Sequence, residues 1–356
     1  MRVVAVHLLN DFSGSPKVLM QLLNSCAKKN IETHLYTCGG RNGFLSDIPK
    51  INTHFYWYRF ANNTVIRLLF FTSSQLFLCL KLLFFLKKSD VLYVNTVLPF
   101  GAGIVGLIRG CKVIYHIHET SIKPKILKCF LFGVVKKSAT EVIYVSNFLA
   151  NQENMKNSKN VLYNVLEEDF VRRAQQHLNR DKNAKIVLMI CSLKAYKGVN
   201  EFIKLAQMNL HITFKLVVNA NQNDIDDYFK NQKKSKNLIV YPTQKDTHPF
   251  YQDASILVNL SDVNSWVETF GLTILEGMAY GLPAIVPPVG GVVELIEDGV
   301  NGYLIDSKKV EIISKKINEL LTNSALYKSM SKYSIEKSKF FSQDYFDNEA
   351  TRIIYK

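Results

Sequence analysis

Several features that define common protein classes are missing from this chain of 356 residues. Its six cysteines have no Cys-x-x-Cys spacing and no companion histidines, so neither a disulfide framework nor a zinc site is indicated. A Gly-x-Gly-x-x-Gly is present as "GAGIVG", 101–106, but five residues separate it from the preceding expected strand, whereas the dinucleotide fingerprint follows its strand directly, so a dinucleotide-dependent oxidoreductase is not favoured. The acidic run "DIDD", 224–227, is interpreted as the first turn of a helix and not as a metal-binding pair of carboxylates. We therefore expect no metal and no other cofactor, and the scattered cysteines fit a reduced, cytoplasmic compartment.

A cleavable signal peptide is also not indicated. The start, "MRVVAVHLLN", has one arginine, a short apolar run and no small-residue cleavage site, so we expect a first β-strand there. The longest apolar stretch, residues 65–88, could span a membrane but is interrupted by Arg67, Lys81 and the polar cluster 72–75. Two interpretations stay open: a buried crossover helix of an α/β domain, or a helix lying in a membrane interface with its cations at headgroup level.

Negative charge is scarce in the first half of the chain. Residues 1–170 hold 20 Lys and Arg against 10 Asp and Glu, so this half carries +10 of the formal net charge of +14. Such an excess favours nucleic acid, an anionic membrane surface or a phosphorylated substrate as partner. No basic-aromatic nucleic-acid motif is present, so nucleic acid is not expected. A basic protein without a special anionic target is the alternative.

Short runs rich in Val and Ile alternate with helix-length segments along the whole chain, which is the pattern of βαβ units in a parallel sheet. The length favours two domains, and the polar segment 164–185 is the expected connection between them. The prediction is an α/β protein with two doubly wound domains, 1–165 and 166–339, and a terminal helix, about 340–356, that ends the second domain or packs back on the first. The expected strands are "RVVAVHLL", "IETHLYT", "DVLYVN", "KVIYHIH" and "EVIYVS", then "KIVLMICS", "TFKLVVNA", "NLIVYP", "ASILVNLS" and "PAIVPP".

The stretch "WVETFGLTILEGMAYGLP" places two glutamates around a predicted helix start. Glu268 falls in the loop, and Glu276 lies just over a turn inside a helix that Gly281 ends. Helix amino-termini at the carboxyl ends of parallel strands hold anions, so a pyrophosphate fits this helix mouth. The alternatives are a helix-dipole contact for Glu268 with an exposed Glu276, or a carboxylate pair of a glycoside hydrolase. The residues expected to offer backbone amides are Phe270, Gly271, Leu272 and Thr273.

Residues 268–306 resemble the carboxyl-terminal domain of glycosyltransferase family 4. The shared pattern is Glu, seven residues, Glu, with Phe-Gly after the first, then Gly-Leu-Pro before a strand, a Gly-Gly loop and an "EDGVNG" turn. The resemblance implies a GT-B fold, in which two Rossmann-like domains face across a cleft, with the nucleotide-sugar donor held mainly by the second and the acceptor by the first. It implies that Glu268 accepts hydrogen bonds from the donor sugar and Glu276 from the ribose, with the pyrophosphate at the amides near Gly271 and Leu272.

A second segment, "CSLKAYKGVNEFIKLA", 191–206, resembles the Gly-Arg-Leu, three residues, Lys-Gly pattern of the same family. Lys197 and Gly198 match its second half, whereas Ser192 stands at the arginine position. The resemblance implies that Lys197 neutralises the donor diphosphate, where a cation stabilises the leaving group most in the transition state. Lys194 is the candidate substitute for the missing arginine, and a solvated loop lysine is the alternative for Lys197.

In the first half, "KVIYHIHETSIKP" ends a strand with His116, His118 and Glu119, and alternation places both histidines on one face. The resemblance places His118 beside the donor sugar, near the bond that breaks. A structural histidine is the alternative, and a zinc pair lacks a third ligand. Gly14, in "LNDFSGSPKVLMQLL", stands where the family often carries a Gly-Gly loop and is a candidate contact for acceptor or diphosphate. An ordinary strand-to-helix turn is its alternative.

The predicted function is that of a retaining glycosyltransferase of family 4. It moves a sugar from a nucleotide-diphosphate sugar to a hydroxyl of a glycan or polyprenyl-diphosphate-linked oligosaccharide in surface polysaccharide biosynthesis, of the O-antigen or capsule kind. Retention and the biosynthetic context are implied by the resemblance. We expect the protein to be cytoplasmic and peripheral at the inner face of the cytoplasmic membrane. The alternatives are a non-catalytic nucleotide-sugar-binding scaffold, or a glycoside hydrolase that uses Glu268 and Glu276.

Overall fold

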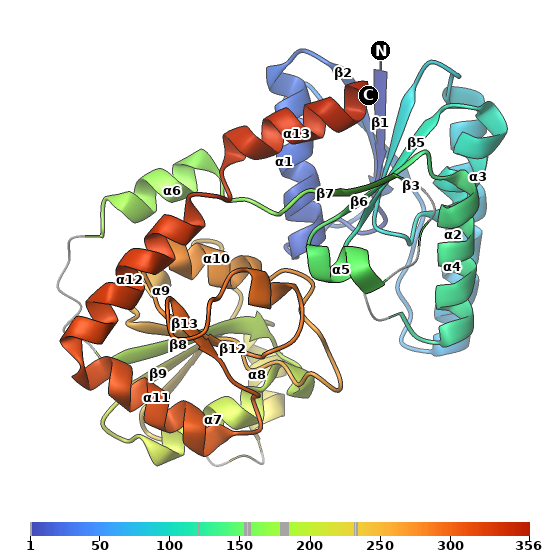
Figure 1. Cartoon of the computed structure of the whole chain (residues 1–356). Helices are drawn as coiled ribbons and strands as arrows, with labels where there is room; N and C mark the ends of the chain where they lie inside the picture. Colours follow the sequence, from blue (N-terminus) through green and yellow to red (C-terminus); the bar gives the residue numbers. More distant parts are fainter. Residues whose placement is uncertain are drawn as a thin grey trace. The chain divides into compact units, whose positions relative to one another are not determined.

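The computed structural model describes residues 2–119, 122–152, 155, 158–178, 185–230, 232 and 234–356. The chain divides into two compact units (Figure 1). Unit 1 contains Met1–Asn164 and Asp344–Lys356, and unit 2 contains Val165–Gln343. Each unit is built on one parallel sheet, so the predicted fold class is confirmed: an α/β protein with two Rossmann-like domains.

The sheet of unit 1 has the strand order β3-β2-β1-β4-β5-β6-β7 in the described part of the chain, and every neighbouring pair is parallel. Its central strands are buried along almost their whole length because helices cover both faces of the sheet. The strands are β1 (Arg2–Val6), β2 (Glu32–Cys38), β3 (Asn52–Tyr56), β4 (Val91–Asn95), β5 (Lys112–Ile117), β6 (Glu141–Tyr144) and β7 (Ser158–Val161).

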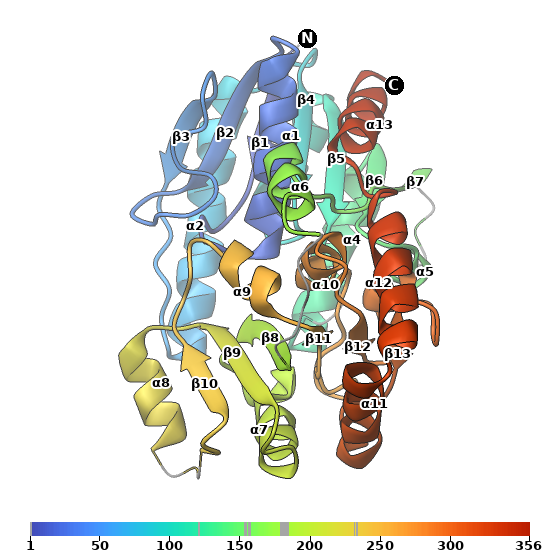
Figure 2. The ribbon, with the colours of Figure 1, turned by 90° about the vertical axis from the view of Figure 1, so that its left-hand side faces the viewer.

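Three helices, α2 (Thr64–Phe85), α3 (Phe100–Arg109) and α4 (Lys125–Ser138), lie side by side on one face of this sheet (Figures 1 and 2). Helices α1 (Gly14–Lys28) and α13 (Gln343–Tyr355) lie on the other face, and the short α5 (Asn147–Gln152) follows β6. Lys112 donates from Nζ to the Ile353 carbonyl at 2.6 Å, and Lys29 donates to the Asp347 carbonyl at 3.0 Å. These bonds hold the carboxyl-terminal helix α13 on unit 1.

The sheet of unit 2 has the strand order β10-β9-β8-β11-β12-β13, again with every pair parallel. The strands are β8 (Ile186–Ser192), β9 (Thr213–Asn219), β10 (Leu238–Tyr241), β11 (Ile256–Val258), β12 (Ala284–Val286) and β13 (Gly302–Leu304). The helices are α6 (Glu168–Gln175), η1 (Ala195–Lys197), α7 (Val199–Met208), α8 (Gln222–Phe229), α9 (His248–Asp253), α10 (Leu272–Ala279), η2 (Gly291–Glu294), α11 (Val310–Thr322) and α12 (Ser324–Ser338).

All ten predicted strands are confirmed, and three further strands were missed: β3, β7 and β13. Each of the three forms an edge of its sheet. Edge strands have one neighbour and are short or partly exposed, so they lack the continuous apolar run on which the prediction depends. The segment 164–185 contains the helix α6, and residues 179–184 lie outside the described residues. Asp224 lies in the first turn of α8, as predicted for "DIDD".

Candidate functional site

The best-defined polar cluster of unit 2 is formed by Lys197, Asn259, Ser261, Trp266 and Glu268. Lys197 closes the η1 turn just after β8, and Asn259 and Ser261 follow β11, which pairs with β8. Because carboxyl ends of parallel strands meet at one edge of a sheet, residues from these loops come together there. We refer to these five residues as the unit 2 cluster.

Glu268 and Lys197 form an ion pair between Oε1 and Nζ, with side chains that are only 19% and 13% exposed. Oε1 also accepts a hydrogen bond from Ser261 Oγ at 3.0 Å and one from Asn259 Nδ2 at 3.4 Å. Burial alone would raise the pKa of Glu268, but the Lys197 charge and these hydrogen bonds bring it below its ordinary value. All three donors use the same oxygen, so Glu268 is an ionised carboxylate with Oε2 on its other side.

Glycines hold the backbone on both sides of this ion pair. Gly198 has φ +81°, and a Cβ there would overlap the Leu260 carbonyl, so only glycine lets the Lys197 turn pack on the end of β11. Gly290 has φ +109° and lies against the backbone of Glu268. Its neighbour Gly291 donates from its amide to the Glu268 carbonyl at 2.7 Å. The Lys-Gly and Gly-Gly motifs therefore position the two charges.

Trp266 restricts Lys197 from a third direction. The Lys197 ammonium lies 4.8 Å from the centre of the Trp266 ring, a cation–π distance, and Tyr196 stacks on the indole with ring centres 5.4 Å apart. The indole Nε1 is buried without a hydrogen-bond partner among the described residues. A buried donor of this kind is satisfied when a ligand oxygen or water reaches it.

The helix mouth beside the cluster has the predicted form. Gly271 is the N-cap of α10 with φ +101°, and the first-turn amides of Leu272 and Thr273 have no acceptor within the helix. The side chain of Phe270 is 2% exposed and packs on Phe341, with ring centres 5.7 Å apart. The donor contact expected of Phe270 is through its backbone amide, and it stays a prediction.

Glu276 is 6% exposed inside α10, so the alternative in which it is simply an exposed charge is wrong. Tyr251 of α9 donates from Oη to Glu276 Oε2 at 2.6 Å. Burial together with the neighbouring Glu276 raises the pKa of Tyr251 well above its ordinary value, which keeps the phenol a proton donor in this bond. The Glu276 carboxylate is therefore held in one orientation.

The other residues predicted to contact the donor are Ser192, Lys194 and Gly14. Ser192 ends β8, and Lys194 is exposed and makes no ion pair with any residue that the structure describes, so its ammonium is available to an anion. Burial raises the pKa of the neighbouring Cys191 to about 12, which keeps it a thiol. Gly14 begins α1 of unit 1, and a Cβ on it would have no atom within 4 Å, so packing does not require glycine there.

In unit 1, His118 follows β5 and is held by Asn95, the last residue of β4. Asn95 Nδ2 donates to the Ser15 carbonyl at 3.0 Å, and a carbonyl only accepts, so Oδ1 is the amide atom that faces His118 Nε2 at 2.9 Å. Nε2 must then carry the hydrogen of the neutral ring, which leaves Nδ1 as an acceptor. Burial, with His116 and His7 adding to it, lowers the pKa of His118 well below its ordinary value.

His116 and Glu119 surround this histidine. The His116 and His118 rings are 4.3 Å apart, His116 Nδ1 is hydrogen bonded to Tyr93 Oη at 2.8 Å, and burial lowers the pKa of His116 to about 3. Glu119 accepts from the amides of Val97 and His118, while burial raises its pKa to about 7. Within the described ranges, no group of three or more His, Cys, Asp or Glu is placed to hold a metal ion. His116 is a buried, neutral residue near the carboxyl end of the central strand β5.

Sequence reasoning missed five of these site residues. Three had a usable signal, because Asn95 ends a strand and Asn259 and Ser261 directly follow one, at the sheet edge where ligands bind. Tyr251 had none, because it reaches Glu276 from another helix, 25 positions earlier. Trp266 lies two residues before Glu268, and its contact with Lys197 depends on the loop geometry.

Known proteins share both the sequence pattern and the fold. Residues 171–337 match the family model of the glycosyl transferases group 1. An uncharacterized glycosyltransferase of Methanocaldococcus jannaschii is 29% identical over 225 residues, which cover 62% of this chain and 61% of that protein. N-acetyl-alpha-D-glucosaminyl L-malate synthase of Bacillus anthracis is 23% identical over 264 residues, 68% of each chain. The crystal structure of Anabaena HepE in complex with UDP and glucose has a TM-score of 0.79 and 17% identity, with 100% of both chains covered.

The structural likeness shows the GT-B fold of two parallel-sheet Rossmann-like domains. The named relatives by sequence include glycosyltransferases, and the model of the glycosyl transferases group 1 matches most of unit 2. The chain spans about three fifths of the length of the archaeal relative.

Proposed function

We propose that the protein transfers one sugar from a nucleotide-diphosphate sugar to a hydroxyl group of an acceptor. The observation that carries the proposal is the arrangement of Glu268, Lys197 and Glu276 around the mouth of α10. Each part of such a donor then has a matching group in unit 2. Glu268 Oε2 accepts from sugar hydroxyls, Lys197 and Lys194 with the first-turn amides hold the diphosphate, and Glu276 accepts from the ribose diol.

In the proposed reaction the bond between the sugar C1 and the diphosphate oxygen breaks, and a bond between C1 and the acceptor oxygen forms. The acceptor proton goes to the departing diphosphate, whose developing charge Lys197 stabilises. We propose retention of configuration and membership of family 4, because the Glu-x7-Glu and Lys-Gly patterns support both. In unit 1, His118 is the group proposed to take part in the transfer, with Nδ1 as a hydrogen-bond acceptor.

A glycoside hydrolase is the rival enzyme that the two glutamates suggest. Such an enzyme needs one carboxylic acid that is protonated near neutral pH. The pKa of Glu268 is lowered and its Oε1 is occupied by Lys197, so Glu268 is unsuited to that role. Tyr251 holds Glu276 as a hydrogen-bond acceptor, which suits a diol contact better than proton donation. The pair therefore favours holding a donor over acid catalysis.

The acceptor that we propose is a glycan or a polyprenyl-diphosphate-linked oligosaccharide, in the assembly of a cell-surface polysaccharide. The proposed location is cytoplasmic, at the inner face of the cytoplasmic membrane. The excess of +10 in residues 1–170 supports an anionic partner for unit 1. A non-catalytic nucleotide-sugar-binding scaffold is the alternative, and it would bind the donor without turning it over.

Donor binding tests the proposal in a thermal-shift screen of the purified protein against UDP-, GDP-, ADP- and CMP-linked sugars. We expect one nucleotide class to raise the melting temperature, because a ligand at about 100 times its Kd adds about 2.7 kcal/mol to the free energy of unfolding. Glu276→Gln is expected to reduce that shift, since it weakens the proposed ribose contact. If no donor stabilises the wild-type protein, the nucleotide-sugar assignment is wrong.

A further inference from the structure

Helix α2 exposes many apolar side chains, whereas two of its five buried residues are polar. Its outward face is mainly apolar, with Leu76 68% and Phe84 87% exposed, and it also carries Thr72 and Lys81. Its inward face packs Phe71, Leu78 and Leu82 but also carries Ser74 and Gln75, and Gln75 Oε1 accepts from the Gly101 amide of α3 at 3.2 Å. A surface helix of a soluble domain normally places such polar residues outside. The exposed apolar side chains of α2 are Val65, Ile66, Leu68, Leu69, Leu76, Phe77, Leu80 and Phe84.

The neighbouring helices extend this apolar surface. On α3, Leu107 and Ile108 are exposed, and on α4 Ile126 and Phe130 are exposed. Helices α2, α3 and α4 lie side by side on one face of the unit 1 sheet (Figure 1). Their exposed apolar residues therefore widen the surface beyond one helix. We call the exposed apolar residues of α2, α3 and α4 the α2–α4 face. A surface of this kind on a soluble domain marks an interaction site.

Positive charge accompanies the α2–α4 face almost without compensation. Residues 48–140 contain 13 Lys and Arg but only two acidic residues, Asp90 and Glu119, so this stretch carries +11 of the total +14. Asp90 is buried in a salt bridge with Arg2, and Glu119 accepts hydrogen bonds from backbone amides. The two acidic groups are thus turned away from the surface, and the exposed charge of this region is cationic.

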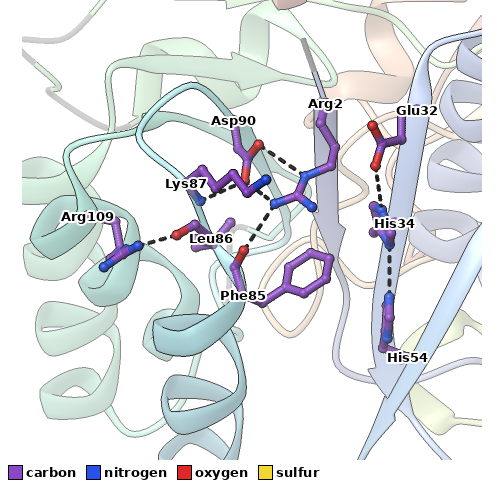
Figure 3. Close-up of polar contacts among 9 residues, drawn as sticks. All are labelled: Arg2, Glu32, His34, His54, Phe85, Leu86, Lys87, Asp90 and Arg109. Atoms are coloured by element: carbon purple, nitrogen blue, oxygen red, sulfur yellow. Dashed lines mark hydrogen bonds and ion pairs between the residues drawn. The ribbon is translucent and has the colours of Figure 1, made fainter.

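Helix α2 is also fixed firmly to its own unit. Arg2 donates from Nη2 to the Phe85 carbonyl at 3.0 Å, and Arg109 donates from Nε to the Leu86 carbonyl at 2.9 Å (Figure 3). Asp90 accepts from Arg2 Nη2 at 2.6 Å and from the Lys87 amide at 2.8 Å, which closes the end of the helix. By length and composition α2 is the one helix of the described residues that could cross a membrane, and only 28% of its most apolar window is buried. These anchors, the buried contacts of its inward face and the hydrogen bond of Gln75 to α3 favour a helix that stays on the sheet.

We infer that the α2–α4 face is the surface by which this protein lies on an anionic lipid bilayer, with α2 parallel to the membrane plane. Apolar side chains then enter the boundary between headgroups and acyl chains, and the cations meet lipid phosphates. Trp57, which is exposed and packs edge-on against Phe70 and Phe77, lies beside α2 as an interfacial tryptophan would. A second copy of the chain is a less suitable partner, because a dimer through this face would bring two positively charged surfaces together. The inference deepens the proposed function by naming its membrane partner, and it does not depend on turnover.

Vesicle flotation of the full chain without donor tests this inference. We expect binding to vesicles with about 30% phosphatidylglycerol at low salt, and much weaker binding to pure phosphatidylcholine. The triple variant Leu76→Gln, Leu80→Gln, Phe84→Gln is expected to bind at least about tenfold more weakly. The matched control, Leu210→Gln with Ile312→Gln, removes exposed apolar residues of unit 2 and is expected to float like the wild type.

Fluorescence quenching locates the contact. Trp266→Phe leaves Trp57 as the sole tryptophan, and lipids brominated on their acyl chains are expected to quench it in anionic vesicles. The inference is overturned if the wild type does not float with anionic vesicles, if the triple variant floats like its control, or if Trp57 is not quenched. It is also overturned if sedimentation velocity shows that the triple variant dissociates a dimer while vesicle binding is unchanged. Donor-induced stabilisation is measured separately, so failure here and failure of the transferase assignment are distinct results.

Discussion

Glu268→Gln is expected to lower kcat by a factor of about 10²–10³, the loss seen when one preorganised electrostatic group is removed from an active site. Glutamine keeps the size of the side chain but removes the negative charge that pairs with Lys197. In the native protein the charge of Lys197 lowers the pKa of this carboxyl against the effect of burial. It also weakens the contact that Glu268 Oε2 is proposed to make with a sugar hydroxyl. Charge-assisted hydrogen bonds of this kind contribute about 1.5–3 kcal/mol each. Steady-state kinetics with the donor found by thermal shift measures both kcat and KM.

Two further variants show whether the loss is specific. Glu276→Gln is expected to raise the donor KM with a smaller change in kcat, because a ribose contact is made equally in the ground state and the transition state. Glu297→Gln changes an exposed carboxylate of the same unit and is expected to leave both constants unchanged. The assignment of Glu268 is wrong if Glu268→Gln has wild-type kinetics, or if Glu297→Gln is impaired to the same degree.

Gly198→Ala is expected to destabilise unit 2 by about 3 kcal/mol or more, which corresponds to a melting temperature lower by roughly 6–12 °C. Two effects add up at this position. The backbone has φ +81°, where a residue with a Cβ is strained, and the added Cβ would overlap the Leu260 carbonyl. Relief of that overlap moves the Lys197 turn away from β11, so the variant is also expected to lose donor-induced stabilisation. Differential scanning calorimetry with and without donor measures both effects.

Gly299→Ala is the matched control for this position. Gly299 lies in the same unit with φ +77°, but a Cβ there would have no atom within 4 Å. The Gly299→Ala variant therefore has the backbone strain without the overlap. It is expected to lose about 1–2 kcal/mol of stability and to bind donor normally. Equal loss of stability in both variants would show that the overlap with Leu260 does not determine the conformation around Lys197.

The two predictions show which parts of the site a sequence pattern can reveal. The Lys-Gly and Gly-Gly motifs are local, and the structure gives each a local reason. Gly198 lies against Leu260, just after β11, and Gly290 lies against Glu268. Most of the parallel strands could also be predicted from the sequence, because burial on both faces makes each of them a continuous apolar run. The edge strands β3, β7 and β13 carry no such run and were missed.

The contacts that hold the predicted site side chains in place could not be predicted from the sequence. Tyr251 reaches Glu276 from α9, and Asn95 holds His118 from a neighbouring strand, so both depend on tertiary packing. The stretch 65–88 shows the same limit, since both a buried crossover helix and an interfacial helix fitted its composition. Only the fold shows that Gln75 points inward and Leu76 outward.

Acceptor-dependent release of nucleoside diphosphate is the measurement that tests the central claim most directly. The donor identified by thermal shift is incubated with the wild-type protein, with and without a lipid extract of bacterial membranes, and free nucleoside diphosphate is quantified. A glycosyltransferase is expected to release it only when the extract supplies an acceptor, and Glu268→Gln is expected to suppress that release. Release at the same rate in water alone would indicate a hydrolase. A donor that binds but is never turned over with the extract would contradict the transferase assignment and indicate a scaffold.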